Sequence, residues 1–461
     1  MTLKGKILLA TSALLILLAG ALGYAISPTA MPSLAAVIAG LAMLLPVAIV
    51  WPVGGLFGAV FLRHSLDVFS DYKIAIPFTT IDINLAAGLS ILVLLACLIY
   101  FLNSNLSFKN IPLNKYWLLF IIGISLSLPL AQLPLTALQE WLKVIVSFCL
   151  FVVGAFYFGL KEHREWLEKL ILCALIIPLI IALYQIVTSS GLIGFGLPSR
   201  AFGTYAHPNS LAFNLVLGLA LLFYFWRKSL KYKKTIVAIL LGGLVMLLFT
   251  YSRAGLISLL GLALIVGLLE YRAVTLKIAG TLVIIYLLFF PVNDWLKKSY
   301  QIDLQNNQLI ARFTKAEEDY NSLDWRTALW HNSLQKISQR PLLGWGYGMF
   351  GQTLGPQNNE VDEPESHNDY VRLWVETGSL GLASYILLQL GIMWVLFKKW
   401  RSYEKRTYQK LQFAILLGIL VAILIQSLSD NILHTTSLQW SWLLLLGASL
   451  AEPWAFSMSK K

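Results

Sequence analysis

Long apolar runs recur along almost the whole chain, and they constrain its fold more than any other feature. A helix needs about 20 apolar residues to cross the hydrocarbon core of a membrane. Runs near that length occupy residues 7–26, 34–50, 53–69, 83–102, 115–130, 139–160, 169–188, 209–226, 235–250, 254–270, 274–292, 378–397, 411–428 and 437–452. The sequence therefore predicts an all-α polytopic membrane protein with about 12–14 transmembrane helices.

Composition supports this fold class. Hydrophobic residues make up 58% of the 461 positions and charged residues only 13%, whereas soluble domains carry about 25% charged residues. The first run is longer than the roughly 7–15 apolar residues of a signal peptide, so we expect it to be retained. The run 53–69 is the least regular, because Pro52, Gly54, Gly55 and Arg63 interrupt it. It is either a short or re-entrant helix or a full span, and we keep it as a span because both basic termini then lie in the cytoplasm.

The net charge of +12 is distributed as the positive-inside rule describes. With fourteen spans, 22 of the 35 Lys and Arg residues fall in segments on the cytoplasmic side. This distribution excludes nucleic acid as a partner and indicates membrane lipids instead. It predicts a multi-pass membrane protein with both termini in the cytoplasm.

Cysteine and histidine give no sign of a metal or disulfide framework. Cys97, Cys149 and Cys173 all lie inside apolar runs, and the six histidines are scattered without ligand spacing. We therefore expect no metal and no cofactor.

Three polar segments fall together on the opposite, outer face in this topology. They are residues 191–209, the turn 250–255 and the long segment 293–377. The last is far longer than a usual connection, which is typical of functional loops. It divides the chain into an N-terminal bundle (1–292), an extracytoplasmic catalytic loop (293–377) and C-terminal helices (378–461). Apolar spacing over 325–337 predicts an amphipathic helix in the loop, and the Gly-rich run 344–348 predicts a tight turn.

His367 lies at the end of the long polar segment. Ser366 and Asp369 fit the capping-box pattern, which places His367 in the first turn of a helix. The helix dipole disfavours an imidazolium there, so the neutral imidazole can act as a general base. A structural role at the helix start is the alternative, and His434, also on the outer face, is the best rival base.

Two arginines beside conformationally special residues share this face. Arg200 lies just before a span, and Arg253 lies in a break between two apolar helices. The planar guanidinium fork suits phosphate oxygens, although arginines at helix ends also extend to lipid headgroups. Arg326 is a third possible phosphate or acceptor contact. Arg372 and Glu376, four residues apart on a helix, either contact substrate or pair with each other.

Four motifs, taken together, resemble the O-antigen ligase and polymerase superfamily. They are His-Asn-Asp-Tyr-x-x-x-Trp-x-Glu-x-Gly-x-x-Gly at 367–381, Pro341-Leu342-Leu343-Gly344-x-Gly-x-Gly, Ser252-Arg253-x-Gly255 and Gly203-Thr204-x-x-x-Pro208-Asn209. The resemblance covers residues 195–430. The combination is specific for the superfamily but separates its members poorly.

The resemblance implies an inverting, metal-independent glycosyltransferase whose donor is a glycan on undecaprenyl diphosphate. Its essential arginines would be Arg200 and Arg253 and its essential histidine His367, with Arg326, Asn368, Arg372, Glu376 and Asn209 contacting substrate. The acceptor would be lipid A-core in lipopolysaccharide biosynthesis (an O-antigen ligase), another lipid-linked repeat (an O-antigen or exopolysaccharide polymerase) or a protein. We favour the ligase, with the polymerase as the first alternative.

Two other classes of protein compete with a transferase. A transporter of polyprenyl-linked glycans would usually show paired halves and ionisable residues near the bilayer midplane. Here the long polar segment divides the spans unequally, and the predicted span interiors are nearly free of Asp, Glu and Lys. A purely structural scaffold would not need arginines at helix breaks.

Overall fold

The computed structural model describes residues 44–69, 73–75, 82–104, 106–159, 161–194, 197–229, 231–300, 322–354 and 365–451. Within these residues the chain is almost entirely helical, as the sequence predicts. The helices are α3 (Pro52–Arg63), α4 (Leu85–Leu102), α5 (Asn114–Ser125), α6 (Pro134–Val153), α7 (Lys161–Ala174), α8 (Ile176–Thr188), α9 (Pro208–Lys228), α10 (Lys233–Phe249), α11 (Arg253–Glu270), α12 (Arg272–Tyr300), α14 (Ser322–Gln339), α15 (Phe350–Leu354), α16 (Asp369–Ser402), α17 (Tyr408–Ser427) and α18 (Thr436–Leu450).

Short elements complete the fold. They are the 3₁₀ turns η1 (Asp67–Phe69), η2 (Phe108–Asn110), η3 (Leu128–Leu130) and η6 (Ile432–His434), the π-helical turn η4 (Gly154–Phe158), and the strands β1 (Lys73–Ala75), β2 (Asp82–Asn84), β3 (Leu192–Gly194) and β4 (Leu197–Arg200). The strands form two antiparallel pairs, β1 with β2 and β3 with β4. In the second pair Leu192 lies opposite Arg200, so the hairpin ends at the predicted arginine.

Seven helices of the described part are long and apolar enough to cross a membrane. They are Leu85–Leu102, Pro134–Phe158, His163–Thr188, Pro208–Lys228, Arg253–Glu270, Asp369–Ser402 and Tyr408–Ser427. Each coincides with an apolar run of the sequence, so the prediction of an all-α polytopic membrane protein is confirmed. The predicted run 7–26 and most of 34–50 lie outside the described residues.

The run 53–69 is a short helix and not a full span. α3 has 12 residues, or about 18 Å at 1.5 Å per residue, against a hydrocarbon core of about 30 Å. Pro52 begins the helix, and Arg63 ends it with a buried side chain that donates to Asp67 and Thr436. Charge bias favours a span over residues 53–69, but the length of α3 does not support a full span in this segment.

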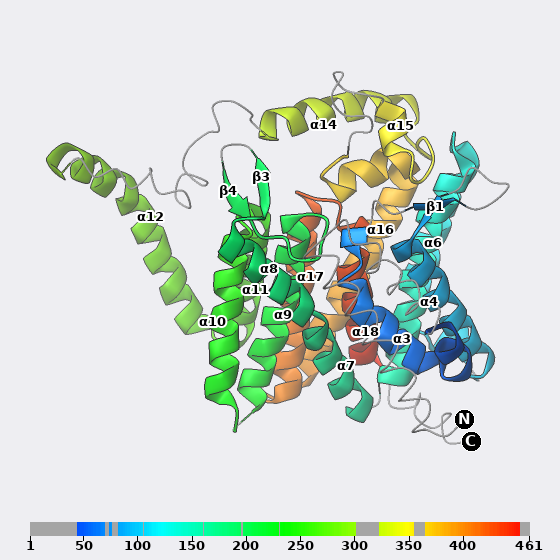
Figure 1. Ribbon diagram of the computed structural model, residues 1–461, viewed down its shortest axis with the longest axis horizontal. Helices are drawn as coiled ribbons and strands as arrows, with labels where there is room; N and C mark the ends of the chain where they lie inside the picture. Colours follow the sequence, from blue (N-terminus) through cyan, green and yellow to red (C-terminus); the bar gives the residue numbers. More distant parts are fainter. Residues whose placement is uncertain are drawn as a thin grey trace.

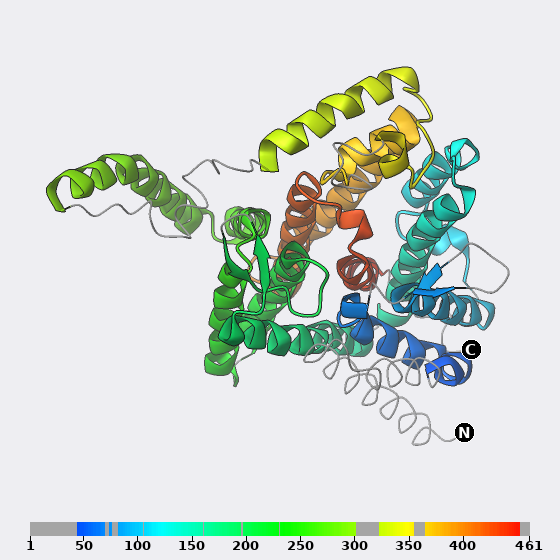
Figure 2. The same ribbon diagram turned by 45° about the horizontal axis from the view of Figure 1, so that its top comes forward.

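α18 lies at the centre of the bundle, as Figure 2 shows. Every residue from Thr436 to Leu450 is buried, because α6, η4, α7, α9 and α3 pack around the helix. α11 packs along α17, and α16 packs between α17 and α5. The helices run roughly side by side, and α14 and α15 lie across one end of the bundle (Figure 1).

The amphipathic helix predicted at 325–337 is confirmed as α14. Leu329 and Ile337 of this helix are buried against Phe350 and Val375. The tight turn predicted at 344–348 is also confirmed, since Gly344, Gly346 and Gly348 all have positive φ angles. The amides of Trp345 and Gly346 donate to Val375 and Glu376 of α16, so the turn packs against that helix. Together with α14 it covers the end of the bundle.

Candidate active site at one end of the bundle

Arg200 lies at the end of β4 with its side chain buried. Its Nε donates to the carbonyl oxygen of Thr250 at 2.9 Å, and an Nη donates to Asn209 Oδ1 at 3.3 Å. The backbone amide of Ala201 donates to Phe249 at the end of α10. These contacts hold the guanidinium inside the protein, unlike an arginine that extends to lipid headgroups.

Asn209, in the first turn of α9, joins three of the segments that form the site. Its Oδ1 accepts from Arg200 and from Ser252 Oγ at 2.8 Å. Its Nδ2 donates to Asp430 Oδ2, also at 2.8 Å. One amide side chain therefore connects the hairpin, the start of α11 and the segment after α17.

Arg253 is the first residue of α11, and the preceding Ser252 caps that helix. Ser252 Oγ accepts from the amide of Gly255 at 3.1 Å, which satisfies one of the free donors of the first turn. Tyr251 has a φ of 49°, so the chain reverses in a left-handed conformation just before the cap. This sharp reversal places Arg253 at the end of the helix and leaves its side chain half-buried.

His367 lies directly before α16 and not in its first turn. The helix begins at Asp369, and its cap is Asn368, whose Oδ1 accepts from the amides of Tyr370 and Val371. The capping box predicted for Ser366 and Asp369 is therefore wrong. Ser366 Oγ instead donates to Asn431 Oδ1 at 2.6 Å, and Asp369 accepts from the amides of Ile432 and Leu433.

His367 has a strained backbone and lies beside the carboxylate of Asp430. The residue has a φ of 45°, a conformation that costs a non-glycine residue about 1–3 kcal/mol. Its Nδ1 lies 3.7 Å from Asp430 Oδ1. A carboxylate beside Nδ1 favours the tautomer that keeps its proton there and leaves the lone pair on Nε2. The nearby carboxylate of Asp430, rather than a place in the first helical turn, thus supports an Nε2 lone pair at His367.

Asp430 is a residue that our sequence reasoning missed as a member of the site. Burial raises the pKa of its carboxyl, but His367, Asn209 and the amide of Asn431 outweigh that effect and hold the pKa below its ordinary value. The carboxylate is therefore charged at neutral pH. The available signal was an acidic residue directly after a long apolar run, in the segment that we considered only for His434.

Arg326, from α14, completes the polar cluster. An Nη donates to the carbonyl oxygen of Ser429 at 3.2 Å. Burial lowers the pKa of its guanidinium, Asp430 opposes that effect and Arg253 adds to it. Arg326 therefore lies near both Arg253 and Asp430, although arginine remains charged at any physiological pH.

His207 belongs to the same cluster, as the N-cap of α9. Its Nδ1 accepts from the amide of Asn209 at 3.1 Å. Burial lowers the pKa of His207 to about 4, with Asp430 raising it and Arg200 and His367 lowering it further. His207 therefore has a structural role at the start of α9.

Arg372 and Glu376 lie apart from this cluster, in the first turns of α16. Both side chains are buried, and Arg372 Nε donates to Glu376 Oε1 at 3.0 Å. Glu376 also accepts from the amide of Phe350, while its carbonyl oxygen accepts from Gly346. The pair thus fixes the Gly-rich turn to α16. Arg372 and Glu376 therefore pair with each other, as one of the two predicted roles has it, and the pair is buried.

His434 forms a second histidine–carboxylate pair. Its Nε2 lies 3.0 Å from Glu140 Oε2 of α6, and Glu140 also lies 3.9 Å from Arg372. Burial lowers the pKa of His434, as does Arg372, while Glu140 raises it. The rival base is therefore grouped with the buried pair of α16 and not with Arg200 or Arg253.

The main cluster suits an anionic ligand next to a proton acceptor. Arg200, Arg253 and Arg326 carry three positive charges, and the carboxylates of Asp430 and Glu365 lie beside them. The N-terminal ends of α9, α11 and α16 meet at this cluster, because Asn209, Ser252 and His367 lie directly at them. Helix N-termini favour negative charge. The arrangement can hold phosphate oxygens beside an oriented imidazole.

These features define the class of protein: a polytopic helical membrane protein with a cationic polar site at one end of its bundle. Residues 235–386 match the O-antigen ligase family. The resemblance stated from the motifs is therefore confirmed, and this segment carries Arg253, Arg326 and His367. No curated protein was found to match the chain.

Proposed function

We propose that the protein is a membrane glycosyltransferase that moves a glycan from undecaprenyl diphosphate to an acceptor hydroxyl. The observation that carries this proposal is the connection of Arg200, Ser252–Arg253 and His367 through Asn209 and Asp430. These residues are far apart in the sequence and come from four segments. The match of residues 235–386 to the O-antigen ligase family supports the same reaction class.

Arg200 and Arg253 bind the diphosphate of the donor in the proposed mechanism. Negative charge grows on the diphosphate as the bond to the anomeric carbon breaks, and fixed guanidinium groups stabilise it. Preorganised electrostatic stabilisation of this kind contributes about 3–4 kcal/mol per group. Arg326 and the helix ends add positive potential at the same place. The diphosphate is a good leaving group, so the reaction needs neither nucleotide nor metal.

His367 acts as the general base. Its Nε2 removes the proton of the acceptor hydroxyl, whose oxygen attacks the anomeric carbon from the side opposite the diphosphate and inverts it. The C–O bond to the diphosphate breaks, and undecaprenyl diphosphate leaves with the bonding electrons. Asp430 orients the imidazole and balances the positive charge that the proton transfer creates on it. General-base help typically gives about 10²–10⁴-fold in rate.

The acceptor that we favour is lipid A-core, which makes the protein an O-antigen ligase acting on the periplasmic face of the inner membrane. A polymerase of lipid-linked repeats would use the same chemistry with a different acceptor, and a protein acceptor is the next alternative. The surface glycan of a deletion strain distinguishes the first two. A lost ligase leaves bare core and accumulates lipid-linked polymer, whereas a lost polymerase leaves core capped with one repeat.

Arginine variants test the donor-binding step. Replacement of Arg253 by Lys keeps the charge but removes the planar fork, so we expect a clear loss of transfer. Replacement of the exposed Arg401, at the other end of α16, by Lys is the matched control and should retain transfer. Full transfer by both variants, Arg253→Lys and Arg253→Ala, would contradict diphosphate binding by this residue.

A further inference from the structure

A large apolar cleft opens at the opposite end of the bundle from the polar site. It encloses about 670 Å³ between α5, α11, α16 and α17. Its lining residues are Tyr116, Ile265, Leu268, Leu269, Leu387, Leu390, Gly391, Met393, Trp394, Phe397, Leu417 and Val421. Apart from the Tyr116 hydroxyl and the indole nitrogen of Trp394, the lining side chains carry no polar group.

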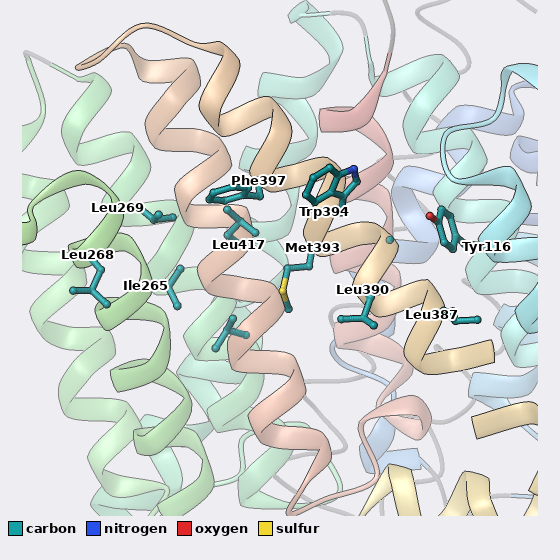
Figure 3. Close-up of a pocket in the computed structure, with 12 residues that line it drawn as sticks. Tyr116, Ile265, Leu268, Leu269, Leu387, Leu390, Met393, Trp394, Phe397 and Leu417 are labelled. Atoms are coloured by element: carbon teal, nitrogen blue, oxygen red, sulfur yellow. The ribbon is translucent and has the colours of Figure 1, made fainter. Parts of the chain in front are cut away.

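The position of the cleft follows from the directions of the helices. α11 begins at Arg253 beside the polar site, and its three lining residues belong to its last six positions. α16 likewise begins beside the site and is broken at Gly378, and its lining residues start at Leu387, nine positions after that break, or about 13 Å at 1.5 Å per residue. In Figure 3 the side chains of α11 lie on one side and Tyr116 lies on the other, with Met393, Trp394 and Leu390 of α16 between them. The cleft therefore extends from the middle of the spans toward the ends that are remote from the site.

Aromatic side chains mark the end of the cleft as a membrane interface. Trp400 lies one turn beyond the lining residue Phe397, and the two rings stack at 5.4 Å. The indole nitrogen of Trp400 donates to Glu270 at 2.7 Å, and Lys410 lies 4.5 Å over the ring. Trp394 is 65% exposed although it lines the cleft. Such rings are typical of the level at which lipid headgroups meet the hydrocarbon.

The rim of the cleft at this end is strongly basic. Lys115 precedes the lining residue Tyr116, and Lys398 follows the lining residue Phe397; both lysines are exposed. The segment 398–410 carries six Lys and Arg residues and one acidic residue, Glu404. An apolar cleft below a basic rim complements a molecule with acyl chains and an anionic headgroup.

We propose that the cleft binds an anionic glycerophospholipid of the leaflet that faces the basic loops. Its acyl chains occupy the space between α11, α16 and α17, and its phosphate lies between Lys115 and Lys398. This site is separate from the polar cluster of His367 and does not depend on the proposed transfer reaction. The bound lipid lies along α16 from Leu387 to Phe397, with α11 and α17 on one side and Tyr116 of α5 on the other.

Native mass spectrometry of the full-length protein tests the proposal. The protein in detergent is titrated with phosphatidylglycerol and with phosphatidylethanolamine of the same acyl chains. We expect tighter binding of phosphatidylglycerol, and the double variant Lys115→Gln/Lys398→Gln should weaken it by about fivefold for each lysine removed. Lys234→Gln, in the first turn of α10, should have no effect. Equal binding of the two lipids by the wild type would overturn the headgroup assignment.

A second pair of variants tests the location. Leu390→Trp places a large side chain into the cleft, whereas Leu380→Trp adds the same bulk at an exposed position of α16 outside it. Only Leu390→Trp should lower phosphatidylglycerol binding. An equal loss in both variants, or binding of undecaprenyl phosphate that displaces phosphatidylglycerol from the wild type, would overturn the proposal.

Fluorescence quenching provides a measurement that needs no bulky variant. Phosphatidylglycerol with brominated acyl chains should quench part of the tryptophan fluorescence of the wild type. Trp394→Phe should remove a fraction of that quenching, because Trp394 lines the cleft. Unchanged quenching in Trp394→Phe would also contradict an acyl chain in the cleft.

Discussion

At the scale of single residues, Asp430 and Asn209 hold the site together. Asn209 bonds to Arg200, Ser252 and Asp430, and Asp430 lies beside His367. A residue with several buried partners positions the others even where it does not touch the reacting atoms. The proposed mechanism therefore depends on both residues as well as on the arginines and the histidine.

Replacement of Asp430 by Asn should lower kcat strongly. The amide keeps the size of the side chain but loses the negative charge beside His367 Nδ1, so the imidazole is less well oriented and its charged form less well stabilised. We expect a fall in kcat on the order of 10–100-fold, with a smaller change in KM for the donor. Glu404→Gln, an exposed residue of the loop between α16 and α17, is the control. A kcat within twofold of the wild-type value would refute the positioning role.

His207 predicts a pH dependence of stability. Its pKa is lowered to about 4 in the folded protein from 6.5, so between these values the unfolded chain binds more protons than the folded protein. The free energy of unfolding should therefore fall as the pH drops from about 6.5 to about 4. His207→Asn keeps a side chain that can cap α9 but cannot titrate.

Thermal unfolding in detergent at pH 7 and pH 5 measures this effect. The fall in Tm between the two pH values should be smaller in His207→Asn than in the wild type. His331→Asn, at an exposed position of α14, should keep the wild-type dependence. An equal fall in Tm for wild type and His207→Asn would contradict the assignment.

At the scale of elements, a glycine break in α16 lets the Gly-rich turn pack against it. Gly378 has φ 62° and ψ −167° inside the helix, a combination that is almost confined to glycine. The amide of Ser379 donates to Pro341, and that of Leu380 to Leu342. A Cβ at Gly378 would lie 2.2 Å from the carbonyl carbon of Leu342. The close packing of the Gly-rich turn on α16 therefore requires glycine at position 378.

Replacement of Gly378 by Ala should destabilise the protein. The backbone conformation alone costs about 1–3 kcal/mol for a non-glycine residue, and the contact with Leu342 adds to it. A clear fall in Tm measured in detergent is expected. Gly88→Ala in α4, where a Cβ would meet no atom within 4 Å, should be neutral or stabilising. Equal stability of the two variants would show that the break is not required.

Elements that depend on apolar periodicity are predicted from the sequence more accurately than features that depend on tertiary contacts. Apolar periodicity and length predict the spans and α14 correctly, because burial in lipid or against the bundle acts on every turn of a helix. The start of α16 is mispredicted, because Ser366 and Asn368 are both good caps and only the fold gives Ser366 its partner Asn431. The role of Asp430 also requires tertiary contacts, since nothing local distinguishes it from a solvated residue at a helix end.

At the scale of the whole molecule, the site and the apolar cleft lie at opposite ends of the same helices. α11 and α16 begin at the polar cluster and end at the basic loops, and α17 runs back between them. The charge bias of the sequence predicts that the basic loops and the polar segments lie on opposite faces of the membrane. Because successive spans cross in alternating directions, Arg200, Arg253 and His367 are then expected on the same face. Which end faces the outside stays a prediction.

Cysteine labelling tests the orientation. With the exposed Cys173 replaced by Ala, a cysteine at the exposed Ser190 should react with a membrane-impermeant maleimide applied to the outer face of the inner membrane. A cysteine at the exposed Lys234, in the first turn of α10, should react only after that membrane is made permeable. The reverse pattern would place the polar site on the cytoplasmic side.

The reaction itself, measured with purified protein, tests the central claim most directly. Wild type, His367→Ala and the control His331→Ala are reconstituted with a glycan on undecaprenyl diphosphate and lipid A-core, and the transferred glycan is quantified over time. We expect His331→Ala to transfer at the wild-type rate and His367→Ala, folded and still able to bind the donor, to be slower by about 10²–10⁴-fold. Transfer by His367→Ala at the wild-type rate would contradict the account.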